Sequence, residues 1–225
     1  MELQKLSGEL LNVQDQERRR LSRSLHDELG QLLVALKMEL DVLDEKQLAP
    51  AIQLADQALS KVRNLSYLLH PPLLDETGMI PALLWYFEGL RKRSELRITF
   101  DYKPAIFPRL TRDRETAIFR IIQEALTNVY RHSGSDDAPI DITLNQDRVT
   151  IRIRDFGKGI NPMASAAGVG ISSMKERMKQ LEGELKISRA DPGTLVEATL
   201  PLYDGGYVGI GGLWGETFHY AHPIV

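Results

Sequence analysis

The chain has 225 residues, of which 43% are hydrophobic and 26% charged, a balance typical of a globular protein that buries a core. Its net charge is −3, so no basic excess indicates nucleic acid and no block of like charge indicates a disordered tail. It has no cysteine, which excludes disulfides and thiolate sites, and no apolar run reaches the ~18 residues that suggest a membrane span.

Two amphipathic helices are predicted in the first third of the chain. The first runs from Leu6 to about Asp44, where apolar residues recur every three or four positions. The second starts at Pro50, a favourable first-turn residue, and ends at Pro71-Pro72. A hairpin of two such helices leaves an apolar stripe exposed, and pairing two hairpins into a four-helix bundle would bury it. We therefore expect a homodimer.

Helices and strands are mixed in the rest of the chain. We expect helices over residues 80–94, 111–132 and 171–181. We expect strands over residues 97–103, 140–146, 148–156, 183–190 and 194–202. This order predicts an α+β sandwich in which helices cover one face of a sheet.

Three regions follow from these patterns. Residues 1–72 are expected to form the helical hairpin and residues 73–202 the α/β domain. Residues 203–225 form a tail rich in Gly and aromatic residues, which fits neither pattern. Three interpretations of this tail are open: a flexible end, a segment that docks on the sheet, and a strand that binds a partner.

The segment SLHDELGQLL, residues 24–33, contains the first group of candidate catalytic residues. His26 lies at the edge of the apolar stripe and faces solvent, with Asp27 beside it and Gln31 little more than one turn away. A carboxylate beside an imidazole can hold the proton of one ring nitrogen and make the other more nucleophilic, and a nearby amide can orient water. The alternative is a surface histidine among solvated charges.

A second group lies in IIQEALTNVYRHSG, residues 121–134. Glu124 and Asn128 are four residues apart and share one helix face, which His132 continues, while apolar residues occupy the other side. These oxygen ligands suit Mg²⁺, with Asn128 as the candidate metal ligand, and Arg131 lies nearby for phosphate. The alternative is an amphipathic helix with a solvated face.

A third group is the glycine-containing loop that joins a strand to a helix. The strand ends at Asp155, which is placed to accept a hydrogen bond from a ligand amine. Glycines let the backbone approach a ligand, and the start of the next helix favours phosphate. The glycines are Gly157, Gly159, Gly168 and Gly170. One such pair alone also fits a β-turn, and neither a P-loop nor a Rossmann motif is present, so an ATP site here requires another fold.

Taken in order, these segments resemble the sensor histidine kinases of two-component systems, especially the subfamily of the nitrate/nitrite sensors and the membrane-fluidity thermosensor. HDELGQ is similar to the phosphoacceptor motif HDxxxQ, and QEALTNVYRHSG to the asparagine box. RDFGKGI and GVGISSMKERMKQLEGEL resemble the two glycine boxes. GTLVEATLPL resembles the final strand, with Gly193 and Thr194 matched. The resemblance covers about residues 8–202.

The resemblance implies a dimeric helical-hairpin domain followed by an α/β sandwich ATP-binding domain of the gyrase, chaperone and histidine kinase type. Asn128 would coordinate Mg²⁺ with support from Glu124, and Asp155 would accept from the adenine amino group. The candidate nucleotide site is completed by Arg131, His132, Thr194 and the four glycines. Asp27 would polarise His26 for attack on the γ-phosphate of ATP, and Gln31 would position water to dephosphorylate the partner.

The implied function is phosphorylation of His26 from Mg-ATP, followed by transfer to an aspartate in the receiver domain of a response regulator, which the protein also dephosphorylates. The alternatives are a phosphatase-biased protein and a nucleotide-binding scaffold with little kinase activity. We expect no direct contact with nucleic acid and a cytoplasmic location.

The first residues also bear on the extent of the protein. The helix over Leu6–Arg20 resembles the end of a coiled coil that enters from upstream. We therefore expect the chain to be part of a longer receptor, in which an upstream sensor region would supply any membrane contact. The alternative is a protein that receives its signal through another chain.

Overall fold

The computed structural model describes residues 2–41, 45–69, 72–145, 147–160 and 169–202. Contacts between residues divide the chain into two compact units. One unit is Glu9–Thr77, and the other is Gly78–Val225 together with Met1–Gly8.

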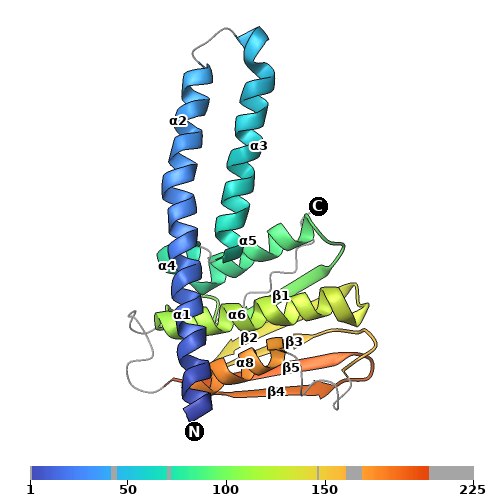
Figure 1. Ribbon diagram of the computed structural model, residues 1–225. Helices are drawn as coiled ribbons and strands as arrows, with labels where there is room; N and C mark the ends of the chain where they lie inside the picture. The colour runs from blue at the N-terminus through green and yellow to red at the C-terminus, as the bar shows by residue number, and fades with distance from the viewer. Residues whose placement is uncertain (1, 42–44, 70–71, 146, 161–168, 203–225) are drawn as a thin grey trace. The chain divides into compact units, whose positions relative to one another are not determined.

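The first unit is a helical hairpin. Helix α1 (Glu2–Ser24) continues through a π-helical turn, η1 (Leu25–Leu29), into α2 (Gly30–Asp41). Helix α3 (Glu45–Leu69) runs back beside α2, and a short helix, α4 (Pro72–Glu76), follows (Figure 1). None of the described helices is both long and apolar enough to cross a membrane. Pro50 lies inside α3 rather than at its start, and the predicted first helix is interrupted by the π-turn.

Polar side chains join the helices of the hairpin. The buried hydroxyls of Ser22 and Ser66 lie 2.9 Å apart, and Ser66 Oγ donates to the Ser22 carbonyl at 2.9 Å. Lys37 Nζ donates to Asp56 Oδ1 at 2.7 Å, which links α2 to α3. These bonds fix the register of the helices but supply little apolar burial.

Many apolar side chains of the hairpin are exposed in the single chain. Among the described residues of α2 and α3, only Ala55 and Leu59 are buried apolar side chains. The exposed ones are Leu10, Val13, Leu21, Leu29, Leu32, Leu36, Met38, Leu54 and Leu65. An exposed apolar surface of this kind indicates an interaction site.

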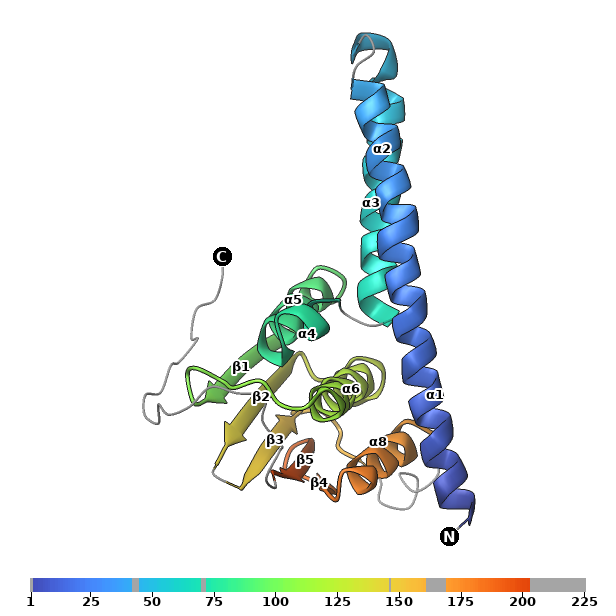
Figure 2. The ribbon, with the colours of Figure 1, turned by 90° about the vertical axis from the view of Figure 1, so that its left-hand side faces the viewer.

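The second unit is a five-stranded mixed sheet covered by helices on one face (Figure 2). The sheet order is β1-β2-β3-β5-β4, in which β1 and β2 are parallel and the other pairs are antiparallel. Its elements are α5 (Met79–Arg91), β1 (Arg97–Lys103), α6 (Arg112–Asn128), η2 (Val129–Ser133), β2 (Asp137–Leu144), β3 (Arg148–Arg154), α8 (Val169–Gln180), β4 (Glu184–Arg189) and β5 (Thr194–Pro201). The predicted α/β sandwich is therefore confirmed.

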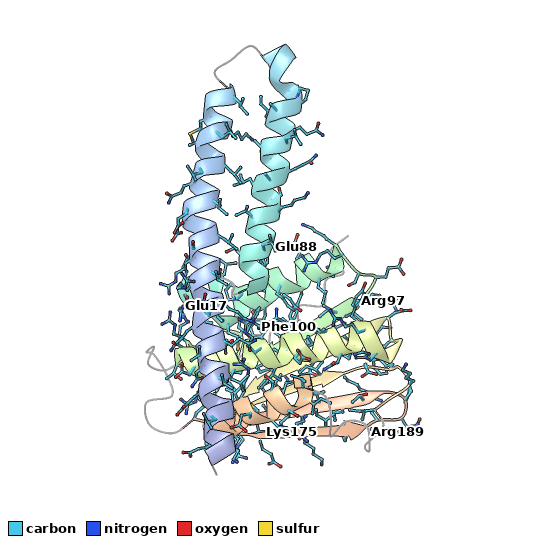
Figure 3. All side chains as sticks on the ribbon, in the orientation of Figure 1. Glu17, Glu88, Arg97, Phe100, Lys175 and Arg189 are labelled. Atoms are coloured by element: carbon cyan, nitrogen blue, oxygen red, sulfur yellow. The ribbon has the colours of Figure 1, made fainter. Side chains whose placement is uncertain are left out.

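Alternation along the strands explains which face the helices cover. On β2 and β3 every second side chain is buried under α6: Ala138, Ile140, Ile142, Leu144, Val149, Ile151 and Ile153. Phe100 of β1, labelled in Figure 3, packs against Phe87 of α5 with the ring centroids 5.1 Å apart. This core holds α6 in place, and α6 forms one wall of the candidate site.

The opposite face of the sheet carries a row of charges across all five strands. Neighbours in this row are Asp101, Asp141, Arg152, Glu197 and Lys186. Burial and the adjacent charge of Asp101 raise the pKa of Asp141. At the start of the same strand, Arg97 donates two hydrogen bonds to Asp137, at 2.7 and 2.6 Å, and these lower the pKa of Asp137.

We predict that Asp141→Asn stabilises the α/β unit at pH 7 and that Asp137→Asn destabilises it. A raised pKa means that ionised Asp141 opposes folding, and this penalty grows as the pH rises through its folded-state pKa. A lowered pKa means that ionised Asp137 favours folding, and this contribution is lost as the pH falls through its folded-state pKa.

Asp137 is half-buried and Asp141 is only partly shielded from water, so solvent screens both charges and the expected shifts in the unfolding midpoint are on the order of 1–2 °C. Thermal unfolding of the two variants at several pH values measures these shifts. The difference between the unfolding midpoints of the two variants should become smaller in acid. A lower midpoint for Asp141→Asn at pH 7 would contradict the assignment.

Candidate functional site

The three candidate catalytic residues line one groove on the hairpin, about 380 Å³ in volume. His26, Asp27 and Gln31 are all exposed. Apolar side chains form the rest of the wall: Val34, Ala35 and Met38 from α2, and Leu59 and Val62 from α3. The groove therefore places an imidazole, a carboxylate and an amide beside an apolar surface.

The π-turn η1 explains why Gln31 faces the same groove as His26. In a regular α-helix, residues five apart point about 140° away from each other. In η1 the backbone N–H of Gly30 bonds to the carbonyl of Leu25, five residues earlier, so the turn holds one extra residue. Gln31 then takes the place of an i+4 residue, about 40° from His26.

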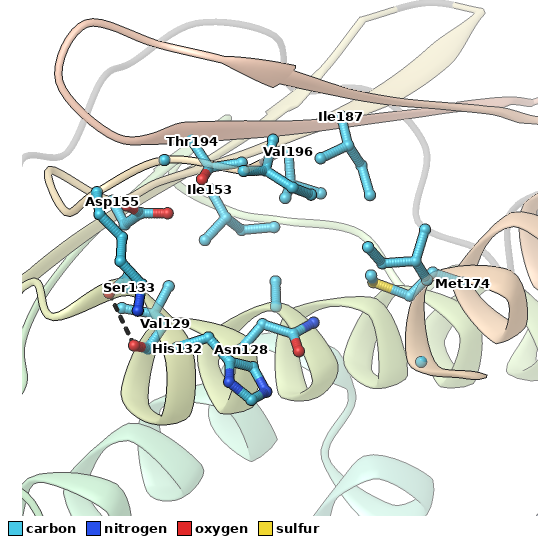
Figure 4. Close-up of a pocket in the computed structure, with 16 residues that line it drawn as sticks. Asn128, Val129, His132, Ser133, Ile153, Asp155, Met174, Ile187, Thr194 and Val196 are labelled. Carbon is cyan, nitrogen blue, oxygen red and sulfur yellow. Dashed lines mark hydrogen bonds between the residues drawn. The ribbon is translucent and has the colours of Figure 1, made fainter. Parts of the chain in front are cut away.

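The second candidate group surrounds a pocket of about 530 Å³ in the α/β unit (Figure 4). Its apolar lining is Ala125, Val129, Ile153, Ile160, Ile171, Met174, Ile187 and Val196. Its other lining residues are Asn128, His132, Ser133, Asp155, Lys158, Gly159, Gly170 and Thr194. An apolar slot with a few polar groups suits a flat heterocycle whose orientation is set by hydrogen bonds.

The buried face of α6 determines which side chains reach this pocket. Ile118, Ile121, Ile122 and Leu126 are fully buried in the core. Ala125 and Val129 are also buried and line the pocket, and the half-buried Asn128 and the following His132 line it beside them. The predicted apolar face of this helix is confirmed.

Glu124 lies at the edge of the same pocket. A Cβ atom on Gly170, which lines the pocket, would lie only 1.9 Å from Glu124 Oε1. The start of α8 therefore passes directly against the Glu124 carboxylate, and any side chain at position 170 would require that carboxylate to move.

Asp155 is a buried carboxylate in the pocket, with 6% of its surface exposed. Its Oδ1 accepts a hydrogen bond from the backbone N–H of Gly157 at 2.9 Å. Its own N–H donates to the Thr194 carbonyl at 3.0 Å, which ties β3 to β5. An ionised carboxylate has about four acceptor positions, so this bond leaves capacity for a ligand donor.

Two close backbone contacts hold the loop after Asp155. A Cβ on Gly157 would lie 2.1 Å from the Ser133 carbonyl oxygen, and the Lys158 N–H donates to the same oxygen at 3.0 Å. Gly193 has φ +98°, and a Cβ there would lie 1.9 Å from the Asp155 carbonyl oxygen. These glycines are required by space, and Gly193 also by its backbone conformation.

Most of the predicted nucleotide residues meet at this pocket. Those that line it are Asn128, His132, Asp155, Gly159, Gly170 and Thr194. Glu124 and Gly157 lie against lining residues, as described above. Arg131 is exposed and is not among the described lining residues, and Gly168 lies outside the described part of the chain.

The motifs did not single out Lys158, Ser133 or the apolar lining. Lys158 stands inside the quoted segment RDFGKGI, but an isolated cation between glycines carries no pattern. The apolar lining is partly visible in the sequence, because Ile153 and Val196 lie on strands with alternating side chains. Its convergence on one cavity depends on the fold.

Two family models match segments of this chain. Residues 17–74 match the family described as "Histidine kinase", and residues 113–204 match the "Histidine kinase-, DNA gyrase B-, and HSP90-like ATPase" family. Together they span more than half of the chain. The chain belongs to the sensor histidine kinases and contains their catalytic portion.

Individual relatives carry corresponding names. The chain is 30% identical over 216 residues to the signal transduction histidine-protein kinase/phosphatase DegS of Brevibacillus brevis, covering 89% of this chain and 55% of that protein. It is 30% identical over 221 residues to the sensor histidine kinase LiaS of Bacillus subtilis, covering 89% and 61%. It is 29% identical over 213 residues to the oxygen sensor histidine kinase NreB of Staphylococcus carnosus, covering 89% and 60%. The chain thus spans about half to three fifths of these relatives.

A solved structure with a similar chain path is the histidine kinase domain of the Erythrobacter litoralis EL346 blue-light activated histidine kinase. Its TM-score is 0.49 at 16% identity, and the match covers 84% of this chain and 94% of that chain.

We predict that Gly193→Ala destabilises the chain by clearly more than Gly134→Ala does. Both glycines have positive φ, so alanine is strained at either position by about 1 kcal/mol. A Cβ at Gly134 meets nothing within 4 Å, whereas one at Gly193 meets the Asp155 carbonyl. Urea unfolding of both variants separates backbone strain from the close contact, and equal losses would show that the contact relaxes without cost.

Proposed function

We propose that this chain is the catalytic portion of a sensor histidine kinase that phosphorylates His26 from Mg-ATP. The proposal rests on one combination of features. The region that matches the ATPase family contains an apolar pocket with a few polar groups, and the region that matches the histidine kinase family exposes His26 beside Asp27 and Gln31. In this proposal residues 1–72 present the histidine and residues 73–202 bind the nucleotide.

The pocket has the groups needed to orient an adenine ring. Asp155 is buried and has acceptor capacity left, so it can accept from the exocyclic amino group. The flat faces of the ring would pack on apolar side chains such as Ile153, Met174 and Val196. Thr194 and His132 supply further polar contacts at the rim. This arrangement favours a purine over a wholly polar ligand.

Asn128 and Glu124 are the residues that would hold Mg²⁺. The described residues contain no cluster of three His, Cys, Asp or Glu side chains that could bind a metal by themselves. Mg²⁺ commonly takes only one or two protein ligands and completes its shell with phosphate oxygens and water. One amide and one carboxylate at the pocket edge fit this pattern, and the ion would neutralise phosphate charge.

The groove residues would perform the phosphoryl transfer at His26. A ring nitrogen of the neutral imidazole attacks the γ-phosphorus, an N–P bond forms, and the bond to the bridging oxygen breaks as ADP leaves. Asp27 would hold the proton on the other ring nitrogen and stabilise the positive charge that develops on the ring. Because His26 is solvent-exposed, the nucleotide pocket of the same or a second chain can approach it.

Gln31 supports a second activity, the dephosphorylation of the regulator. The π-turn places its amide on the same groove as His26, where it could orient a water molecule toward a phosphoaspartate that docks at the histidine. The relative DegS is named a kinase/phosphatase. We therefore include a receiver domain as the phosphoryl acceptor and as the phosphatase substrate.

The exposed leucines of the hairpin support a homodimer. Leu32 and Leu54 are each 66% exposed in the single chain. Burying a leucine side chain is worth about 1.5–3 kcal/mol, so a second hairpin that covers the stripe would gain substantial free energy. The dimer would work in the cytoplasm, with a sensor region elsewhere in a longer receptor.

We predict that His26→Gln abolishes phosphorylation while the affinity for ATP is nearly unchanged, because the pocket residues are untouched. The measurement is incubation with γ-labelled ATP and Mg²⁺, with acid and alkali treatment of the labelled chain. Phosphohistidine survives alkali and is lost in acid. Glu28→Gln, an exposed neighbour that does not line the groove, is the control and should label normally. Undiminished label on His26→Gln would refute the proposal.

We predict that Gln31→Ala retains autophosphorylation and loses at least tenfold in dephosphorylation of a receiver domain, because only the hydrolytic step uses its amide. The substrate is a receiver domain that accepts label from the chain, and loss of its phosphoaspartate is followed in time. Gln57→Ala, at an exposed position of α3 outside the groove, is the control. Equal loss of both activities would assign Gln31 to the groove's structure instead.

A further inference from the structure

We infer that Arg109 is a positioning residue for the proposed phosphoryl transfer, because it fixes the joint at which the chain passes from the hairpin into the α/β unit. The inference rests on the proposed kinase activity and concerns a residue outside the described lining of both candidate sites. The joint is the peptide between Thr77, the last residue of the hairpin unit, and Gly78, where the chain enters the α/β unit.

The chain is held on the hairpin side of this joint. Asp75 of α4 forms an ion pair with Arg19 of α1, whose side chain is only 12% exposed. Thr77 is tied back to the same short helix, because its N–H and its Oγ1 both donate to the Leu73 carbonyl, at 2.8 and 2.9 Å. The contacts of α4 with α1 therefore hold the chain as far as Thr77.

The chain is also held on the other side, where α5 begins at once. Its first residue, Met79, is buried, and so are Ala82 and Leu83 in the same turn. Between the two held segments, only the backbone torsions of Thr77 and Gly78 are left to set the direction of α5. A large change of torsion at a few residues between elements is how hinges commonly work.

Arg109 packs against the backbone of this joint. Gly78 has φ +95°, a conformation that favours glycine, and a Cβ there would lie 2.7 Å from Arg109 Cδ and 2.9 Å from its Nε. The arginine thus occupies the space where a side chain on Gly78 would lie. Its position limits the torsions that Gly78 can adopt.

Glu115, near the start of α6, holds Arg109 in this position. Arg109 Nε and Nη2 donate to the two carboxylate oxygens at 2.9 and 3.1 Å, and the Leu110 N–H donates to Glu115 Oε1 at 3.1 Å. The Glu115 side chain is 3% exposed, and a bidentate pair has a fixed geometry. A buried ion pair often adds no more stability than apolar residues of the same size, so fixing the joint explains this pair better than stability does.

The ion pair lies far along α6 from the nucleotide pocket. Glu115 is in the first turn of the helix and Asn128 is its last residue, roughly 20 Å away at 1.5 Å per residue. Loss of the pair should therefore leave the nucleotide contacts intact. It should change how precisely bound ATP is delivered to His26.

The first test is the double variant Arg109→Met, Glu115→Gln, which removes both charges together and leaves no buried charge unpaired. We expect phosphorylation of His26 from γ-labelled ATP to slow roughly tenfold, while the ATP affinity measured by calorimetry is nearly unchanged. Arg109→Lys keeps the charge without the bidentate contact and should show a smaller change in the same direction. The control is Arg97→Met, Asp137→Asn, which removes a bidentate pair of the same unit away from the joint and should label at the unaltered rate.

A distance measurement tests the joint itself. The chain has no cysteine, so spin labels attach only to an introduced pair, Gln57→Cys on α3 and Lys175→Cys on α8, both at exposed positions. Labelled chain is diluted with unlabelled chain, so that pulsed electron paramagnetic resonance records distances within one copy. We expect a broader distribution of distances in the double variant and an unchanged one in the control.

The outcomes separate this inference from the proposed activity. A slower rate and a broader distribution at unchanged ATP affinity support it. An unchanged or faster rate overturns the role of Arg109 and leaves the proposed kinase standing. A slower rate with an unchanged distribution, or with an equal loss of ATP affinity, assigns the pair to the stability of the α/β unit and also overturns that role. An unaltered chain that forms no phosphohistidine refutes the proposed activity itself.

Discussion

The nucleotide pocket depends on the close approach between the end of α6 and the loop that follows β3. The Ser133 carbonyl oxygen lies where a side chain on Gly157 would begin, and it also accepts the Lys158 N–H. Ser133 Oγ in turn donates to the Val129 carbonyl at 2.7 Å, so the last turn of the helix is closed by its own side chain. Because helix and loop touch through backbone, the positions of Asp155 and Asn128 relative to each other are set without any flexible side chain between them.

Both candidate sites lie at a π-turn, and the physical effect is the same in each. One extra residue in a helical turn rotates the following side chains relative to the preceding ones. At Leu25–Leu29 this brings Gln31 into line with His26, and at Val129–Ser133 it changes the direction of Arg131 and His132 relative to Asn128. Such turns lose regular α-helical geometry, so their place at the two sites is consistent with a functional arrangement rather than with packing alone.

The sequence predicted the regular elements well because their side-chain periods are strong. The strand over residues 97–103 and the buried face of α6 follow directly from alternation and three-to-four spacing. The π-turns could not be predicted, because one extra residue in a turn does not visibly change the three-to-four spacing of the apolar residues around it. Helix α4 was not predicted, because two consecutive prolines indicate the end of a helix. In the structure Pro72 is the first residue of α4. Lys158 was not singled out because its place in the pocket lining follows from a backbone contact with Ser133, which is distant from it in the sequence.

The two units differ in what holds them together, and this difference bears on regulation. The α/β unit has a complete apolar core, in which Ile118, Ile121 and Leu126 are fully buried. The hairpin has the Ser22–Ser66 and Lys37–Asp56 contacts, while many of its leucines are exposed in the single chain. In the proposed dimer, a second hairpin that covers these side chains would add most of the apolar burial of the helices. A change in the packing of the proposed dimer would therefore alter the hairpin more readily than the pocket. In the proposed kinase, control would act on the presentation of His26 and Gln31, while the affinity for nucleotide stays constant.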